Sequence, residues 1–182
     1  MPLRPGRPLR AARRDNELMS NAVSLEAIDI DKPDDVNVIL GQAHFIKTVD
    51  DLHETLVSTS PRARFGIAFC EASGVRLIRR SGNDSEMVAL AIGAAQAIGA
   101  GHSFVIMLRE AFPVNVLNAI KAVPELCTIF CATANPVSVL VASTAQGRGV
   151  IGVIDGGPPL GVEQAADVDQ RRALLRDLGY KL

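Results

Sequence analysis

The sequence has no tryptophan, one tyrosine and six phenylalanines, so aromatic residues make up 4% of its 182 positions. Hydrophobic residues still account for 48% of the chain, which excludes a disordered protein. The core must therefore be built from Val, Ile, Leu and Ala, and such a core favours helix-covered strands over an aromatic-rich sandwich. We expect an α/β fold: a single domain with a mixed, largely buried sheet flanked by helices.

Cysteine is also scarce, and the three cysteines cannot form a disulfide framework. Cys127 and Cys131 lie in a segment of β-branched and aromatic residues that is typical of a strand. Four strand residues span about 13 Å, too far for two thiols to share a metal ion. We expect free thiols in a cytoplasmic protein. No run approaches the roughly 20 apolar residues that cross a bilayer, so a membrane is not an expected partner.

Acidic residues are missing from the first fourteen positions, which contain five arginines. The remainder has 14 basic and 20 acidic residues, a net charge of −6. An acidic body with a short basic leader is a poor binder of nucleic acid. Residues 1–18 contain no apolar run of the kind found in secretory signals. We expect residues 1–18 to be a disordered leader or a misassigned gene start, and residues 19–182 to be the domain.

Apolar periodicity and Gly/Pro punctuation predict alternating strands and helices. The predicted strands cover residues 22–30, 36–40, 64–70, 75–79, 102–108, 127–133, 137–143 and 149–154. The predicted helices cover residues 49–58, 85–99, 114–122 and 163–178. A polar turn at 31–35 suits a hairpin between the first two strands.

The segment Phe65–Gly74 is an apolar run that leads directly into a carboxylate, Glu71, and a small-residue turn. A short apolar run bounded by a turn is typical of a strand buried on both faces. Ligands of open α/β sheets bind just beyond the carboxyl ends of such strands. Glu71 is therefore a candidate catalytic or binding group, although a solvated loop carboxylate is the favoured interpretation of this segment taken alone.

Polar residues gather in five loops, each next to a predicted buried strand. They are Gln42, His44 and Lys47; Glu71, Ser73 and Gly74; Gly82, Asn83 and Asp84; Thr133 and Asn135; and Gln146, Gly147, Arg148 and Gly149. Loops at one edge of a parallel sheet converge on one site. Antiparallel strands would divide them between the two ends of the sheet.

The turn Gln146-Gly147-Arg148-Gly149 resembles an anion site, because Arg binds phosphate bidentately and Gly lets the backbone approach. A hairpin turn with an exposed arginine is the simpler interpretation. No G-x-x-x-x-G-K-[ST] phosphate loop occurs in the chain. Lys47 is a candidate second phosphate contact, or a solvated lysine that precedes a helix.

The remaining candidates also have structural interpretations, and for Asn83 and Asp84 the structural one is favoured. His44 lies between Ala43 and Phe45, so it suits a core histidine as well as a general base. Asn83 and Asp84 match a helix cap. Asn115 suits either recognition of a purine edge or helix capping.

Several of these segments, in this order, resemble the family of adenosine-specific kinases, small archaeal and bacterial α/β proteins. The similar segments are 41–48, 65–74, 81–84, 112–121, 129–136, 146–149 and 179–181, and together they extend over residues 24–182. The chain departs from the family pattern at Ala111, where Gly is usual, and at Ser143, where an acid is frequent.

The resemblance implies an enzyme that binds adenosine or AMP and ATP, and transfers phosphate to the nucleoside 5′-hydroxyl with Mg²⁺. It also implies a homo-oligomer, such as a trimer. Phosphoryl transfer needs cations at the phosphates and a polar group beside the attacking hydroxyl. We expect Arg148 and Lys47 at the phosphates, Glu71 or Asp84 at the hydroxyl or Mg²⁺, and His44 in support. The alternative is an adenine-nucleotide-binding or sensor protein without turnover; a structural oligomer without a ligand is a third interpretation.

Overall fold

The structure is a computed structural model that describes residues 22–181, and within them it has eight strands and four helices. The strands are β1 (Ser24–Asp29), β2 (Asn37–Ala43), β3 (Arg64–Cys70), β4 (Ile78–Gly82), β5 (Ser103–Arg109), β6 (Leu126–Thr133), β7 (Val137–Ser143) and β8 (Arg148–Asp155). The helices are α2 (Thr48–Thr59), α3 (Ser85–Ile98), α4 (Pro113–Lys121) and α5 (Ala165–Asp177). The predicted α/β class is confirmed.

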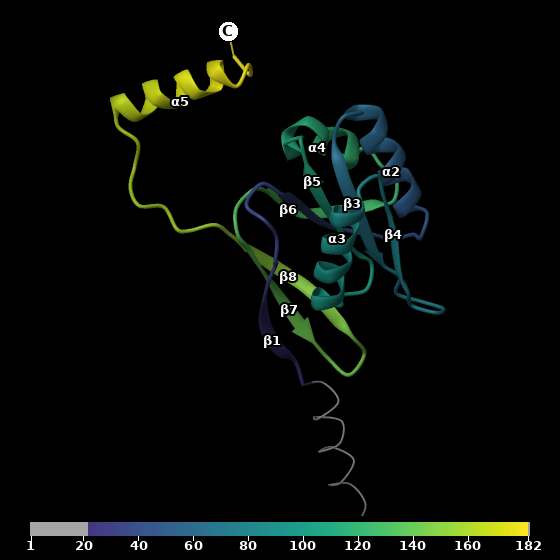
Figure 1. The fold of residues 1–182 in the computed structure, drawn as a ribbon. Helices are drawn as coiled ribbons and strands as arrows, with labels where there is room; N and C mark the ends of the chain where they lie inside the picture. The colour runs from purple at the N-terminus through teal and green to yellow at the C-terminus, as the bar shows by residue number, and fades with distance from the viewer. Residues whose placement is uncertain (1–21, 182) are drawn as a thin grey trace, which may run out of the picture.

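The strands form two sheets, and every strand pair in them is antiparallel (Figure 1). The larger sheet has the order β4-β3-β5-β2-β6, and the smaller one has the order β1-β7-β8. The expected hairpin between β1 and β2 is wrong, because β1 pairs with β7. Since Ser24 lies opposite Ser143, this partner was too far along the chain for local turn signals to reveal.

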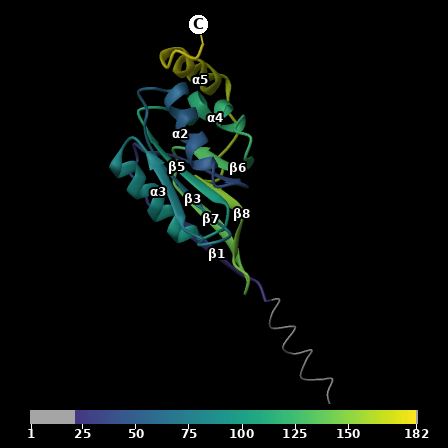
Figure 2. The same cartoon turned by 90° about the vertical axis from the view of Figure 1, so that its right-hand side faces the viewer.

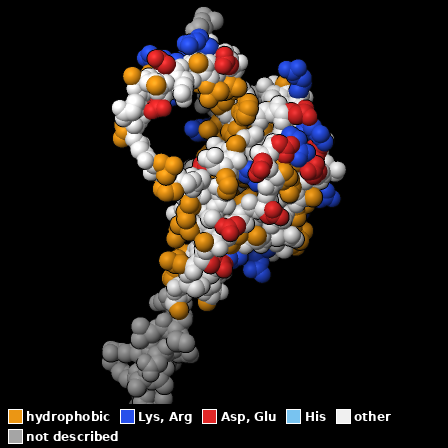
Figure 3. All heavy atoms as spheres, turned by 60° about the vertical axis from the view of Figure 1, so that its left-hand side comes forward, with side chains coloured by type: hydrophobic (Ala, Val, Ile, Leu, Met, Phe, Trp, Pro, Cys, Tyr) orange, Lys and Arg blue, Asp and Glu red, His pale blue; other side chains and the backbone are white. Residues whose placement is uncertain are grey.

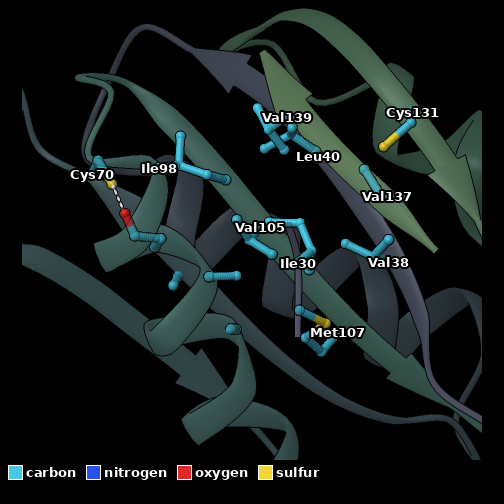
Figure 4. Close-up of a cluster of buried hydrophobic side chains, with 14 of the residues drawn as sticks. Ile30, Val38, Leu40, Cys70, Ile98, Val105, Met107, Cys131, Val137 and Val139 are labelled. Carbon is cyan, nitrogen blue, oxygen red and sulfur yellow. Dashed lines mark hydrogen bonds between the residues drawn. The ribbon is translucent and has the colours of Figure 1, made fainter. Parts of the chain in front are cut away.

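The five-stranded sheet is buried on both faces (Figures 1 and 2). One face packs against α2 and α4, with Leu52, Leu56 and Ile120 among the buried residues. The opposite face packs against α3 and the inner face of the small sheet. Figure 4 shows this second cluster, in which Val137 and Val139 of β7 lie near Val38 and Leu40 of β2. The result is a layered core built mainly of aliphatic residues, with Phe65, Phe69 and Phe104 fully buried on the side of α2 and α4.

Strand β3 shows why the two faces differ. Phe65, Ile67 and Phe69 point toward α2 and α4, whereas the small residues of β3 point toward α3. A side chain at Gly66 would place its Cβ 2.2 Å from the backbone of Met87. Alternating large and small residues therefore let α3 approach the sheet closely.

Most element bounds agree with the prediction to within two residues. There are two exceptions. Strand β2 was predicted to end at residue 40 and ends at Ala43, so Gln42 lies in the strand rather than in the expected loop, because pairing with β5 and β6 continues through it. Strand β4 was predicted at 75–79 and is found at Ile78–Gly82, because residues 71–77 form a loop in which Arg76 has a positive φ of 52°. The strand assignment around Cys127 and Cys131 is confirmed. The proposed leader, 1–18, lies outside the described residues, so the domain division remains a prediction. No helix within residues 22–181 is long and apolar enough to cross a bilayer.

Candidate functional site

A cleft of about 950 Å³ lies between the β3–β4 loop, the C-terminal end of α3 and the β7–β8 turn. The five-stranded sheet supplies Cys70 and Glu71, α3 supplies Gln96, and the turn supplies residues 146–149. The antiparallel topology explains this arrangement, because β3 ends and β5 begins at the same end of the sheet. The cleft thus combines two polar loops that the sequence had identified separately.

Glu71 lines the cleft at the end of buried β3. Its Oε2 accepts hydrogen bonds from the backbone N–H of Leu77 at 3.1 Å and from Nη2 of Arg79 at 3.0 Å. These contacts, the Leu77 amide above all, lower the pKa of Glu71. Within the described residues, Oε1 accepts no hydrogen bond. Glu71 is therefore an ionised carboxylate with one oxygen available to a ligand.

Arg148, the first residue of β8, lines the cleft from the opposite element. Its Nη1 donates to the carbonyl of Ala97 at 3.0 Å and its Nε donates to Oγ of Ser143 at 3.3 Å. Nη2 forms an ion pair with Glu26 of β1. The guanidinium is thus held at the C-terminal end of α3, where the helix dipole favours a cation.

The β7–β8 turn does not offer its backbone amides freely to an anion. The N–H of Gly147 donates to the carbonyl of Thr144 at 3.2 Å, and the N–H of Gln146 donates to Oγ1 of Thr144, also at 3.2 Å. Gly149 is paired with Ala142 within the β7–β8 ladder. Anion recognition at this turn would therefore depend on the side chains of Arg148 and Gln146.

Sequence reasoning missed three further polar residues that line the cleft: Arg76, Gln96 and Thr144. Arg76 is exposed, and it forms no ion pair with another residue in the described part of the chain. Its only sequence signal was its place in the loop after Glu71. Gln96 lies on a helix of small apolar residues, where a lone polar side chain near the C-terminal end was the available clue.

Ser73 and Gly74 lie in the same β3–β4 loop, between the cleft-lining residues Ala72 and Val75. The carbonyl of Ser73 accepts a hydrogen bond from the N–H of Arg76 at 3.3 Å. Gly74 has a φ of +64°, a conformation that favours glycine. Both residues therefore shape the turn that positions Arg76.

A second polar cluster lies at the same end of the sheet and contains His44, Lys47, Asp51 and Glu125. Lys47 Nζ forms ion pairs with Asp51 and, at 2.7 Å, with Oε1 of Glu125. These two carboxylates, Asp51 first, raise the pKa of Lys47. Nδ1 of His44 lies 2.9 Å from the Glu125 carbonyl oxygen. Glu125 is buried, and its Oε2 has no hydrogen-bond partner in the described chain.

This second cluster is adjacent to the cleft but does not line it. The N–H of Ala43 donates to the carbonyl of His102, and the N–H of His102 donates to the carbonyl of Cys70. Two strand spacings therefore separate His44 from Glu71, or about 10 Å along the end of the sheet. Gln42 is the exposed penultimate residue of β2, one position before this connection.

The other candidates lie at the opposite end of the five-stranded sheet. Asp84 caps α3 by accepting a hydrogen bond from the N–H of Met87 at 3.0 Å, and it pairs with Arg64. These two contacts lower its pKa. The side chain of Asn83 accepts a hydrogen bond from the N–H of Phe65 and donates one to the carbonyl of Ala63. The antiparallel pairing therefore divides the predicted site between the two ends, as the sequence analysis anticipated for such a sheet.

Asn115 and Asn135 also have structural partners. Oδ1 of Asn115 accepts from the N–H of Phe112 at 2.9 Å, which completes the N-terminal cap of α4. Nδ2 of Asn135 donates to Oδ1 of Asp155 at 3.0 Å. In this chain, both asparagines stabilise turns at the far end of the sheet.

The cleft offers one protein oxygen to a metal ion whose other ligands would be phosphate oxygens of a bound nucleotide. Residues 22–181 contain no group of three or more His, Cys, Asp or Glu side chains that would hold a metal ion. Mg²⁺ in phosphotransferases needs one or two carboxylates plus phosphate oxygens, and the free Oε1 of Glu71 fits that requirement. Cys70 also lines the cleft, and burial raises the pKa of its thiol, which disfavours the nucleophilic thiolate.

Comparisons with known proteins agree with this architecture. A family model described as "Adenosine specific kinase" matches residues 28–181. The crystal structure of the PH1918 protein from Pyrococcus horikoshii OT3 is 48% identical in sequence, with a TM-score of 0.85. The similarity covers 88% of this chain and 99% of that chain. No curated protein matches the chain. The extent of the family match and the identity with this relative show that the chain belongs to the adenosine-specific kinase family.

Proposed function

We propose that the protein is an adenosine kinase that binds adenosine and ATP at the cleft and releases AMP and ADP. The observation that supports this most directly is the placing of Arg148 and the ionised Glu71 on facing elements of one cleft. Its volume of about 950 Å³ is at the upper end of the range for small-molecule sites. A nucleoside and the phosphates of a second nucleotide would fill such a space.

Arg148 would hold the phosphates of ATP, because a guanidinium pairs with phosphate oxygens bidentately. Arg76 lines the same cleft and would add a second positive charge. Lys47, expected from the sequence to contact phosphate, lies at the neighbouring cluster and is already paired with two carboxylates. We therefore place Lys47 at the edge of the site, where it would contact the outer phosphate of a ligand that extends toward His44.

Glu71 would orient the 5′-hydroxyl by accepting its hydrogen bond at Oε1. A carboxylate with a lowered pKa is a weak proton acceptor, so its role is positioning rather than proton abstraction. Mg²⁺, when bound with ATP, supplies charge neutralisation at the phosphates, and Oε1 of Glu71 is the described oxygen that would hold it. These two uses of Oε1 are alternatives.

The transfer itself joins the 5′-oxygen of adenosine to the γ-phosphorus of ATP. The bond between that phosphorus and the bridging oxygen of ADP breaks, and the hydroxyl proton leaves to solvent, because His44 lies outside the cleft and about 10 Å from Glu71. Little covalent chemistry is required of the protein, since positioning and electrostatic stabilisation account for most catalysis of phosphoryl transfer. We leave Asp84, Asn83 and Asn115 out of the site because each one holds a turn or helix cap at the far end of the sheet.

A nucleotide-binding or sensor role in the cytoplasm is the alternative. It is favoured by the carboxylates that already neutralise Arg148 and Lys47, Glu26 for the first and Asp51 and Glu125 for the second. A sensor needs affinity for AMP or adenosine but no turnover. In either role the working form would be a homo-oligomer, such as a trimer.

One experiment separates these functions. The purified protein is incubated with adenosine, ATP and Mg²⁺, and AMP is measured by chromatography, with guanosine in place of adenosine as the specificity control. AMP formation that requires adenosine supports the kinase. Saturable binding of AMP or adenosine in calorimetry without turnover supports the sensor. The absence of both would remove the nucleotide proposal altogether.

A further inference from the structure

The C-terminal arm, residues 156–181, extends away from the body of the protein (Figures 1 and 3). We propose that the arm of one copy packs on the small sheet of a second copy of this chain. The proposal rests on the homo-oligomer of the proposed function, extends it to specific surfaces, and requires no nucleotide chemistry. Its test by mass is therefore separate from the test by AMP formation.

Helix α5 has no buried residue. Its 13 residues are close to the length below which an isolated helix is marginal in water, so a stable α5 needs a surface to pack against. The large apolar side chains Leu174 and Leu178 lie one turn apart and are 56% and 51% exposed. Exposed leucines one turn apart are the apolar positions through which this otherwise polar helix can pack against another element.

The small sheet has a corresponding uncovered face, defined here as the outer sheet face. Leu25, Ala27, Leu140 and Ile154 belong to it, because their positions in the ladders are opposite in direction to the buried Val137, Val139 and Val141. We include Ile151, an exposed residue at the irregularity in β8. Leu25 is 68% exposed and Ile151 is 58% exposed. Helix α3 packs with the other side of this sheet. The exposed apolar face of the small sheet and the exposed leucines of α5 could pack together as two adjacent layers of an α/β structure.

The connection to α5 explains why the helix does not cover its own sheet. The N–H of Gly156 donates to the carbonyl of Pro136 at 3.0 Å, which fixes the chain at the end of β8. Pro158 and Pro159 follow, and consecutive prolines stiffen and extend a linker. Residues 156–164 span up to about 30 Å when extended, enough to reach a neighbouring copy.

The exposed apolar residues of the small sheet and the arm are together numerous enough for a stable interface. In Figure 3, hydrophobic side chains form a band along the narrow lower part of the molecule, which the small sheet forms. Nine exposed large apolar residues lie on the small sheet, on its preceding residue or on the arm: Val23, Leu25, Ile151, Ile154, Leu160, Val162, Leu174, Leu178 and Tyr180. At roughly 100 Å² each, they provide about 900 Å² per copy, comparable with the roughly 800 Å² that each partner buries in a typical stable complex.

The test measures the mass of the full-length protein in solution by sedimentation and light scattering. Wild-type protein is expected to exceed the 19.3 kDa of one chain. The double substitution L174D/L178D on the arm, and separately I151D on the outer sheet face, should each raise the dissociation constant of the oligomer by at least about 100-fold. V57D is the matched control, because Val57 is an exposed apolar residue of α2 away from both surfaces.

Amide hydrogen exchange of residues 165–177 then identifies what α5 packs against. Docking on a second copy makes the protection of α5 fall when the protein is diluted below its dissociation constant. Protection that does not change with dilution would mean that the arm folds back on its own chain, and this would overturn the proposal. So would a wild-type mass of one chain at all concentrations, or oligomers that survive both the arm and the sheet substitutions.

Discussion

Arg148 of β8 forms an ion pair with Glu26 of β1, although β7 lies between the two strands. The side chain crosses Ser143 of β7, whose hydroxyl accepts from Arg148 Nε. The carboxylate that pairs with Arg148 is thus supplied by β1 rather than by Ser143 of β7. The same guanidinium reaches the C-terminal end of α3, so Arg148 connects the small sheet to a wall of the cleft.

Arg148→Ala should weaken the binding of ATP or AMP by about 10- to 100-fold, because a charge-assisted contact contributes roughly 1.5–3 kcal/mol. Isothermal titration calorimetry measures this directly. Arg62→Ala is the matched control, since Arg62 is an exposed arginine in the α2–β3 connection. Unchanged affinity in the Arg148 variant would remove this residue from the site.

Glu26→Gln should strengthen the binding of ATP or AMP, whereas Arg148→Ala should weaken it. The substitution removes the negative charge next to Arg148 but leaves the contacts of Arg148 with Ala97 and Ser143 in place. Phosphate affinity is therefore expected to rise by a few fold at low ionic strength and to return toward the wild-type value in high salt. A loss of affinity in the same calorimetric titration would show that Glu26 positions Arg148 for binding rather than competing with the ligand.

Substitutions of Asp84 test whether this predicted catalytic residue serves as a helix cap instead. Asp84→Ala should lower Tm by roughly 2–6 °C, because α3 loses its N-terminal cap, while the nucleotide dissociation constant stays within about twofold of wild type. Asp84→Asn should recover most of the lost stability, since Asn also caps helices. Thermal melts and calorimetry on the same samples check both parts. A large loss of binding in a stable Asp84→Asn variant would return Asp84 to the site.

The sequence revealed the elements better than their arrangement. The bounds of β7 were predicted at 137–143 and found at Val137–Ser143, because Asn135-Pro136 and the glycine-rich turn at 147–149 mark its ends. Local signals of this kind do not identify the strand with which a segment pairs. The pairing of β1 with β7 joins segments more than a hundred residues apart, and no turn between them encodes it.

The same limit explains the outcome for the site. Glu71 and Arg148 were selected individually by their positions after and before strands, and the fold brings them to one cleft. Asp84 was selected by the same kind of pattern, but it lies one antiparallel strand further along, at the opposite end of the sheet. Arg76 was missed because its role depends on a loop conformation with a positive φ at a residue other than glycine.

Gly66 and Gly93 form a matched pair that tests the contact between β3 and α3. A Cβ at Gly66 would lie 2.2 Å from the backbone of Met87 and Val88, whereas a Cβ at Gly93 would meet nothing within 4 Å. Gly66→Ala should therefore destabilise the protein by about 3 kcal/mol or more, a fall in Tm of roughly 6–12 °C. Gly93→Ala should stabilise α3 by about 1 kcal/mol. Denaturant titrations measure both, and a Gly66→Ala variant as stable as wild type would contradict the close packing.

Glu71 gives the protein a pH-dependent stability whose sign follows from its contacts. The Leu77 amide and Arg79 lower the pKa of Glu71 in the folded state, so folding favours the ionised form. The stabilisation is complete above the pKa of the unfolded chain, about 4.3 for Glu, and it is lost as the pH falls through the lower pKa of the folded protein.

Glu71→Gln removes this contribution, so the variant should melt a few degrees below wild type at pH 7, and the difference should shrink as the pH falls below about 4.3. Thermal melts between pH 3 and 7 measure it. Glu54→Gln is the control, because Glu54 is exposed on α2 and forms no hydrogen bond or ion pair with another described residue. A difference between Glu71→Gln and wild type that stays constant down to pH 3 would mean that packing, and not the ionised carboxylate, accounts for the stabilisation.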